Sequence, residues 1–417
     1  MKADEANQCG KCGLCLTSCP VYKATREETT APRAKIHLIK NFAHDTLPAS
    51  DRMQKKLQCC LMCGTCTNMC PGGVQHDILF MRMRQEMGSR QGRSKEVKAA
   101  GAILPKENRL RLVSKAARLG ASSLAQRIIG RMRIGNIPIE NFPMPNARPF
   151  RDQVPEIIEP SGRPVGTVVY FTGCATNHIF ERTGHASVKV LTRMGYRVIL
   201  PKNQGCCGLP LFFHGDIKQA EDTILANIDV LQAVSCDAIL VDCATCGSAL
   251  GHAYPQLMTE LDLPDRPARR LAEKVWDIGE FVFRHFDQLA PHLDPGKNKE
   301  TVTYHLPCHL KNHGQEKTMV ENLLKELPHV DYQKTGDWDS CCGGGGFFFN
   351  EYPEISKKIV DSKIKNAVNT GAQSWATGCP GCRVQLSGNL PQKGMMDVCH
   401  PMEIIVRGLK QTAKTDE

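Results

Sequence analysis

The sequence predicts a multi-domain α+β protein, in which a helical N-terminal domain precedes two duplicated α/β domains with parallel sheets. One cysteine motif occurs twice near the N-terminus, and a different cysteine signature occurs twice in the second half of the chain. A length of 417 residues fits several domains better than one core. We expect a helical domain over 1–90, a connecting segment over 91–164, and α/β domains over 165–290 and 300–410.

Composition indicates a cytoplasmic protein with reduced thiols. No stretch approaches the roughly 18 uninterrupted apolar residues of a transmembrane helix, and the first residues lack the apolar core of a signal peptide. Twenty-one cysteines, an odd number, argue for metal ligation rather than a disulfide framework in such a compartment. A peripheral position on the inner face of the cell membrane stays open.

The N-terminal motif is the run Cys-x2-Cys-x2-Cys-x3-Cys-Pro. It is typical of ferredoxins with two [4Fe-4S] clusters, in which the fourth cysteine of each run ligates the other cluster. A pair of zinc ribbons is the alternative, although these favour separate CxxC knuckles. Residues 33–57, between the runs, are expected to form short helices. The predicted ligands are Cys9, Cys12, Cys15 and Cys70 for the first cluster, and Cys60, Cys63, Cys66 and Cys19 for the second.

A strongly basic segment covers residues 81–135. Its fourteen Lys or Arg residues and three acids give a net charge of +11, against +10 for the whole chain. Leu110, Val113, Ala117 and Leu124 recur at helical spacing, so we expect basic amphipathic helices joined at Gly120. A solvated connector, a dock for an acidic partner subunit and a contact with anionic lipid are the open interpretations. Nucleic acid is not expected as a partner, because aromatic side chains for base stacking are lacking.

Prolines dominate the next stretch, residues 136–164, which contains seven of them. Few apolar pairs accompany these prolines. The composition predicts a semi-extended spacer between the N-terminal domain and the duplicated body.

The second half carries a signature of five cysteines in two copies. Corresponding cysteines are separated by 134 residues at the first position, 135 at the adjacent pair and 136 at the CxxC. This nearly constant offset indicates an internal duplication. The first copy is Cys174, Cys206, Cys207, Cys243 and Cys246, and the second is Cys308, Cys341, Cys342, Cys379 and Cys382.

Strand and helix patterns alternate through both copies. Such alternation predicts parallel, Rossmann-like sheets, whose ligands gather outside the carboxyl ends of the strands. Because each cysteine position follows a predicted strand, all five thiols of a copy are expected to converge. The predicted strands cover 165–171, 196–200 and 238–241, then 301–306, the vicinity of 330, and 373–376. The predicted helices cover 178–194 and 216–234, then 317–327 and 355–369.

Each copy offers one thiol more than the four that a cubane cluster requires. For both adjacent cysteines to face one site the backbone must turn sharply, and Gly208 and the Gly343–Gly346 run permit that turn. A non-cubane cluster, a cubane with one free redox thiol, and zinc are the open interpretations of each site. Outside both patterns, the cysteines expected to be ordinary buried residues are Cys59, Cys236 and Cys399.

Several histidines lie close in sequence to the first cysteine of each copy. A hydrogen bond to a cluster sulfur and proton transfer are open interpretations for them, but such residues more often support neighbouring groups or lie at the surface, and direct metal ligation is not expected. They are His178 and His185 in the first copy, and His305, His309 and His313 in the second.

These motifs and their order resemble a known family. Two ferredoxin motifs followed by two copies of the Cys-Cys-Gly and CxxC signature are similar to the iron-sulfur subunit of glycolate or D-lactate dehydrogenases and to heterodisulfide reductases, where the cysteine-rich repeat is called the CCG domain. The iron-sulfur subunit of anaerobic glycerol-3-phosphate dehydrogenase has a similar layout. In the heterodisulfide enzymes five cysteines hold a non-cubane [4Fe-4S] cluster, so the resemblance implies this role for both sets. It covers nearly the whole chain.

The resemblance implies an electron-transfer subunit rather than an enzyme with its own substrate. The sequence has no GxGxxG after a strand and no Walker loop, so flavin or nicotinamide chemistry is expected on another polypeptide. We expect a hetero-oligomer, with an FAD-containing 2-hydroxy acid dehydrogenase subunit as donor and a quinone, membrane partner or other carrier as acceptor. The alternative is catalytic: a CCG cluster reduces a disulfide, with Cys341 and Cys342 as the reactive residues.

Overall fold

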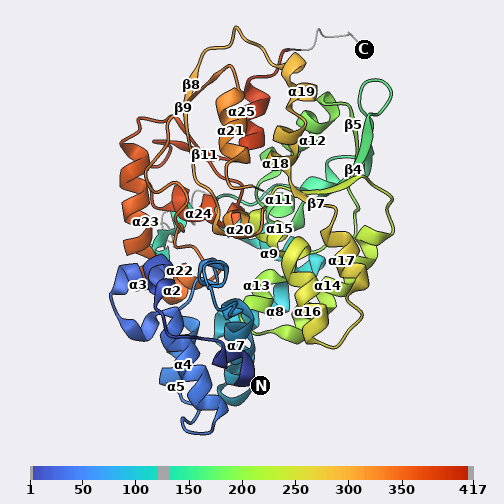
Figure 1. Ribbon diagram of the computed structural model, residues 1–417. Helices are drawn as coiled ribbons and strands as arrows, with labels where there is room; N and C mark the ends of the chain where they lie inside the picture. The colour runs from blue at the N-terminus through green and yellow to red at the C-terminus, as the bar shows by residue number, and fades with distance from the viewer. Residues whose placement is uncertain (1–2, 121–131, 315, 412–417) are drawn as a thin grey trace.

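The computed structural model describes residues 3–120, 132–314 and 316–411. Figure 1 shows the N-terminal helices at one end of the molecule and the two α/β domains side by side above them. Parallel sheets in both α/β domains and a helical N-terminal domain confirm the predicted fold class. Among the described residues, no helix is long and apolar enough to cross a membrane.

Short helices and cysteine-bearing loops form the N-terminal domain. Gly13 and Gly64, each directly after the second cysteine of a run, take left-handed backbone angles (φ 83° and 74°) and so allow the chain to turn into the next helix. The expected helices between the runs are present. The elements are α1 (Ala3–Asn7), α2 (Leu14–Ser18), α3 (Pro20–Thr25), a 3-10 turn (Glu28–Thr30), α4 (Pro32–Ala43), α5 (Asp51–Gln58), α6 (Thr65–Asn68) and α7 (His76–Gln91).

The first α/β domain contains a five-stranded sheet of order β3-β5-β4-β6-β7. All of its strand pairs are parallel except β3 with β5. Its strands are β3 (Ile157–Ile158), β4 (Gly166–Phe171), β5 (Tyr196–Ile199), β6 (Ala238–Val241) and β7 (Val275–Asp277). Its helices are α11 (Gly173–His178), α12 (Glu181–Arg193), α13 (Leu209–Phe213), α14 (Ile217–Gln232), α15 (Ala244–Ser248), a π-helical turn (Ala249–Ala253), α16 (Tyr254–Glu260), α17 (Arg266–Ala272), α18 (Ile278–Arg284), α19 (Phe286–Leu289) and a 3-10 turn (Ala290–His292).

The second α/β domain repeats this topology without the antiparallel edge. Its parallel sheet has the order β11-β10-β8-β9, which matches β7-β6-β4-β5 of the first domain. In each domain the strand that pairs with β6 or β10 at the edge of the sheet, β7 or β11, was not expected from the sequence. The strands are β8 (Glu300–Tyr304), β9 (Val330–Tyr332), β10 (Ser374–Ala376) and β11 (Asp397–Cys399). The helices are α20 (Cys308–His313), α21 (Met319–Glu326), α22 (Phe348–Glu351), α23 (Pro353–Val368), α24 (Pro380–Gly388) and α25 (Pro401–Arg407).

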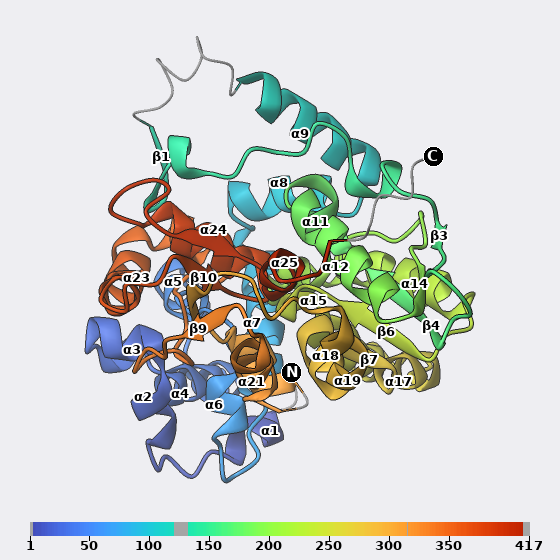
Figure 2. The same ribbon diagram turned by 90° about the horizontal axis from the view of Figure 1, so that it is seen from above.

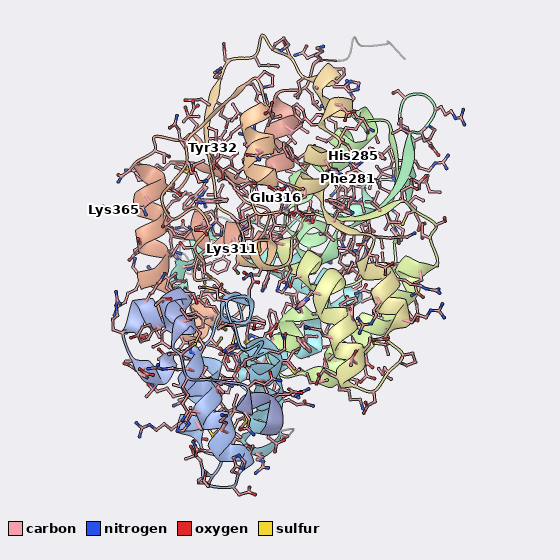
Figure 3. All side chains as sticks on the ribbon, in the orientation of Figure 1. Phe281, His285, Lys311, Glu316, Tyr332 and Lys365 are labelled. Atoms are coloured by element: carbon pink, nitrogen blue, oxygen red, sulfur yellow. The ribbon has the colours of Figure 1, made fainter. Side chains whose placement is uncertain are left out.

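The two α/β domains share one hydrophobic core. Helix α12 packs on α25 and helix α18 packs on α21, so apolar side chains from both sheets form one continuous cluster. The ring centroids of Phe281 on α18 and of His285, the residue that follows this helix, lie 4.4 Å apart. Both residues are labelled in Figure 3. A second cluster joins α7 of the N-terminal domain to α13 and α14 of the first α/β domain. The duplication therefore produces two sheets whose relative position is fixed by packing.

The proline-rich segment differs from the predicted spacer. Strands β1 (Arg133–Ile134) and β2 (Ile137–Pro138) pair, 3-10 turns follow at Ile139–Asn141 and Phe150–Asp152, and β3 joins the edge of the first sheet. Ile137 and Phe150 are fully buried. The prediction is wrong because proline content restricts the backbone but does not prevent spaced apolar side chains from packing on the body.

The basic segment divides into an internal and an exposed part. Arg82 of α7 pairs with Glu5 and Glu260, and the buried Arg84 donates to four backbone carbonyls, so these charges hold the protein's own elements together. Helices α8 (Lys95–Ile103) and α9 (Glu107–Gly120) follow. None of the α9 residues is buried, and Figure 2 shows the helix lying across the outside of the molecule. The predicted contributions of Leu124, Arg127 and Arg131 lie outside the described residues.

Candidate iron-sulfur centres

The first N-terminal site gathers the cysteines of the first run. Burial raises the pKa of the Cys15 thiol, and the thiols of Cys9 and Cys12 raise it further. A methyl group on Gly72 would lie 3.0 Å from the Gln8 carbonyl oxygen and 3.9 Å from Cys70 Sγ. The loop that carries Cys70 therefore packs against the turn before Cys9, as the exchange of fourth cysteines requires.

The second N-terminal site brings Cys19 to the second run. Burial, followed by the thiols of Cys63 and Cys60, raises the pKa of Cys19 to about 11. Cys19, Cys60, Cys63 and Cys66 all line one cavity. These four are the thiols that the ferredoxin pattern predicts, and their soft donors suit iron-sulfur clusters. Cys59, which the pattern does not include, lines the same cavity.

The first CCG site lies at the carboxyl end of the first sheet. The Cys174 thiol interacts with Cys206, and the Cys207 thiol interacts with both Cys206 and Cys246. Cys243, two residues after the end of β6, is the N-cap residue of helix α15, and its thiol interacts with Cys246. The structure thus brings the predicted set together. Gly208, at φ 79°, makes the turn that lets both adjacent cysteines face the site.

The second CCG site repeats this arrangement. Cys342 Sγ lies 3.3 Å from Cys382 Sγ, the Cys341 thiol interacts with Cys308, and that of Cys379 with Cys382. Gly343 has a φ of 83°, and a methyl group there would lie 3.0 Å from the Ser356 carbonyl oxygen. Each site therefore holds five converging thiols, a donor set that fits an iron-sulfur cluster or zinc.

The sites adjoin one another in a series. Cys63 belongs to a packed cluster that Cys19, Cys308 and Cys341 adjoin, so the second N-terminal site borders the second CCG site. Burial, and after it the thiol of Cys308, raises the pKa of Cys63 to about 12. A hydrogen bond from Cys243 is the main reason that the pKa of Cys379 lies well below its usual range. The second CCG site therefore also contacts the first. Sequence reasoning predicted each site but not this order.

Helix α20 is the junction of the three domains. Its His309 places Nδ1 3.1 Å from Thr245 Oγ1 and Nε2 3.2 Å from the Met62 carbonyl oxygen. The Asn312 side chain donates to the Cys63 carbonyl oxygen at 2.7 Å. Asn312 was missed from the sequence, where the only signal is its position one helical turn after Cys308.

The histidines of the first copy have other partners. His178 Nε2 lies 3.1 Å from Glu107 Oε1 of α9, and His185 Nε2 lies 3.0 Å from Gln153 Oε1. These rings hold the connecting segment to the first α/β domain. The three cysteines outside the signatures are buried, as predicted: Cys59, Cys236 and Cys399.

A groove of equivalent construction borders each CCG site. Residues 202–206 and α14 form it in the first domain, and residues 337–341 and α23 in the second. The N-terminal domain forms the opposite wall of the second groove. Lys311 of α20, labelled in Figure 3, also lines this groove and donates a hydrogen bond to Asp339 at 2.6 Å. In the first groove, the wall opposite α14 is formed by residues 104–111 and by the ion pair of Arg111 with Asp152. The first CCG site therefore borders a groove that the N-terminal domain does not cover.

Comparison with protein families agrees with this organisation. A cysteine-rich domain, CCG, matches residues 168–251 and again 302–387, and a 4Fe-4S dicluster domain matches residues 5–74. The chain belongs to the iron-sulfur proteins that combine a 4Fe-4S dicluster domain with two CCG domains.

Curated relatives cover almost the full length of the chain. It is 27% identical to the probable glycolate oxidase iron-sulfur subunit of Bacillus subtilis, over 95% of this chain and 91% of the relative. It is 24% identical to the glycolate oxidase iron-sulfur subunit of Escherichia coli, over 97% and 94%. It is also 24% identical to one of the polypeptides of the dihydromethanophenazine:CoB–CoM heterodisulfide reductase of Methanosarcina mazei, over 92% and 88%.

Proposed function

We propose that this chain is the electron-transfer subunit of a flavin-dependent 2-hydroxy acid dehydrogenase complex. The observation that carries the proposal is that three of the thiol sites adjoin one another, where Cys63 packs beside Cys308 and where Cys243 contacts Cys379. Iron-sulfur clusters bound at these sites supply one-electron transfer. The relatives named as glycolate oxidase iron-sulfur subunits support glycolate as the substrate, and we propose D-lactate beside it as a 2-hydroxy acid of the same class.

The exposed Cys12 and the buried Cys206, at opposite ends of the series, each lie at a surface groove. Cys12 is exposed and lines a surface groove together with Lys23 and Arg26. At the other end, Cys206 lines the first groove. We assign the donor, an FAD-containing subunit, to one end and a quinone, membrane partner or other carrier to the other. The glycines at 343–346 do not bind nucleotide in this proposal, because a methyl group on Gly345 would lie 2.5 Å from Leu61.

The proposed cofactors are two cubane clusters in the N-terminal domain and one or two further, non-cubane clusters in the CCG domains, with zinc as the alternative in one of them. Metal analysis of the anaerobically purified chain separates these cases. Four clusters require about sixteen iron atoms, three clusters with zinc in one CCG site require about twelve, and N-terminal clusters alone require about eight. Substantial zinc with about eight irons would contradict an electron path through the CCG sites.

The test of function uses the holoprotein mixed anaerobically with a flavin-containing 2-hydroxy acid dehydrogenase, D-lactate or glycolate, and a quinone analogue. We expect quinone reduction to require the chain. We expect it to fall at least tenfold in a Cys308→Ser variant that keeps its N-terminal clusters. A Cys236→Ser variant, which changes a buried cysteine outside both sites, is the control. Unchanged quinone reduction in Cys308→Ser would contradict the proposed path.

A peripheral membrane position is proposed for the complex, with helix α9 as the contact. Leu112 and Leu119 of α9 are 68% and 77% exposed, and Arg109 and Lys115 lie among them. An exposed helix of this composition suits anionic lipid. We expect the holoprotein to sediment with phosphatidylglycerol vesicles and a Leu112→Ser, Leu119→Ser variant to do so much less. Equal sedimentation of both forms would refute this contact.

A catalytic alternative rests on the facing CCG sites. Both keep all five cysteines, and Cys243 and Cys379 meet between them. A disulfide would take up two electrons and two protons there and leave as two thiols. With reduced viologen as the electron source and a panel of disulfides, the electron-transfer proposal expects no thiol production. Sustained turnover that is lost in Cys341 or Cys342 variants would favour the catalytic alternative.

A further inference from the structure

A histidine lies among the thiols of the second CCG site. His305 follows strand β8 directly, its backbone N–H donates to the Ala376 carbonyl oxygen at 2.9 Å, and its side chain is fully buried. One ligand-type atom each from His305, Cys342 and Cys382 lie within 4.8 Å of one another. The end of a core strand therefore holds the imidazole near the two sulfur atoms, and neither of its buried ring nitrogens has a hydrogen-bond partner among the described residues.

The first CCG site has a phenylalanine at the corresponding position. The offset of 134 residues that relates Cys174 to Cys308 also relates Phe171 to His305. A methyl group on Gly173 would lie 3.0 Å from Cys246 Sγ and 3.6 Å from Phe171 Cε1, so the Phe171 ring borders Cys246. The same corner of the duplicated site is thus apolar in one copy and carries ring nitrogens in the other.

Only one of these two side chains can donate a hydrogen bond to a thiolate. A neutral imidazole offers one N–H donor, and a phenyl ring offers none. The five thiols already exceed the four corners of a cubane, which leaves the imidazole the role of hydrogen-bond donor rather than ligand. Hydrogen bonds to cluster sulfur atoms are among the factors that set reduction potentials.

We propose that His305 donates a hydrogen bond to the sulfur of Cys342 or Cys382 and thereby gives the second CCG site a higher reduction potential than the first. His305 is a positioning and tuning residue, and Phe171 leaves the first site without this donor. The inference rests on the proposed function, because it requires a redox-active cluster at the second CCG site. Electrons from the N-terminal clusters would accordingly settle on the second CCG site before the first.

The test is a potentiometric titration of the anaerobically purified holoprotein, followed by electron paramagnetic resonance. The signal that disappears in Cys342→Ser identifies the second CCG site. His305→Phe, which copies the first site, is expected to lower the reduced-to-oxidised ratio of that signal at least tenfold at a fixed potential, a shift of about 59 mV for a one-electron couple. His305→Gln keeps an N–H donor and should restore most of the shift. Phe171→Leu is the matched control and should leave the second site unchanged.

Iron content and the magnetic coupling of histidine nitrogen to the cluster distinguish hydrogen bonding by His305 from direct ligation by His305. We expect His305→Phe to retain its iron, and protein labelled with nitrogen-15 histidine to show a weak coupling that His305→Phe lacks. An unshifted midpoint in His305→Phe with intact signals would overturn this inference alone. A strong coupling, with iron lost in both His305 variants, would show ligation and overturn it as well. Zinc at the second site of the unmodified chain would overturn both this inference and the electron path.

Discussion

The hydroxyl of Thr245 in the first CCG domain lies 3.7 Å from Cys379 Sγ in the second. The same hydroxyl lies 3.1 Å from His309 Nδ1, and His309 Nε2 reaches the Met62 carbonyl oxygen of the N-terminal domain at 3.2 Å. Two side chains thus connect all three domains beside the thiols. This connection holds the sites at fixed separations, which an electron path needs.

Removing the Thr245 hydroxyl should weaken this junction. We expect Thr245→Val to lower the free energy of unfolding by about 1 kcal/mol, because a net intramolecular hydrogen bond contributes about that amount. Thr245→Ser keeps the hydroxyl and should lose less. Chemical unfolding of the anaerobic holoprotein measures both variants, and equal losses would show that the methyl group rather than the hydroxyl matters.

Replacing the fourth cysteine of one N-terminal run should remove the cluster that is bound mainly by the other run. We expect Cys19→Ser to impair the cluster of Cys60, Cys63 and Cys66, and Cys70→Ser to impair that of Cys9, Cys12 and Cys15, with a loss of up to about four iron atoms each. Iron analysis and electron paramagnetic resonance distinguish the two remaining signals. Loss of the same signal in both variants would refute the exchange.

The packed connecting segment should contribute to stability. Phe150 is fully buried, with its ring 6.4 Å from Tyr170 and 4.9 Å from His185. We expect Phe150→Ala to cost about 3–5 kcal/mol in the free energy of unfolding, as large-to-small core substitutions do. Met144→Ala changes an exposed residue of the same segment and should stay within about 0.5 kcal/mol. A small effect of Phe150→Ala would restore the spacer interpretation.

The His252–His313 contact should make stability depend on pH. The rings lie 4.1 Å apart, and burial, then the neighbouring His252, lowers the pKa of His313 from 6.5 to about 3. Between these values the unfolded chain binds more protons, so the stabilising contribution is complete above about pH 6.5 and is lost as the pH falls toward about 3. Between these two pKa values the free energy of unfolding should change with pH by up to about 1.4 kcal/mol per pH unit.

Unfolding measured from about pH 7.5 to pH 5 tests this dependence. The variant His313→Asn removes the titrating group while keeping a polar side chain, so its stability should fall less steeply with acid. The same slope in both proteins would show that His313 does not carry the effect.

Much of the fold could be predicted because its signals are local or periodic. The strand β6, Ala238–Val241, matches the predicted range, and the parallel sheets follow from alternating strands and helices. The short strands β7 and β11 were missed because three apolar or mixed residues carry little periodic signal. The buried positions of Ile137 and Phe150 depend on a partner surface that no local pattern describes.

The cysteine spacing alone was enough to predict four thiol sites and the duplication, since ligand spacing along a chain reflects the geometry of one site. It could not show that Cys63 borders Cys308 or that Cys243 meets Cys379, residues 245 and 136 positions apart. Those neighbours depend on how three packed domains orient one another. The order of the sites therefore emerged only from tertiary packing. The sequence offset pairs Phe171 with His305, but only packing places these two side chains beside the thiols.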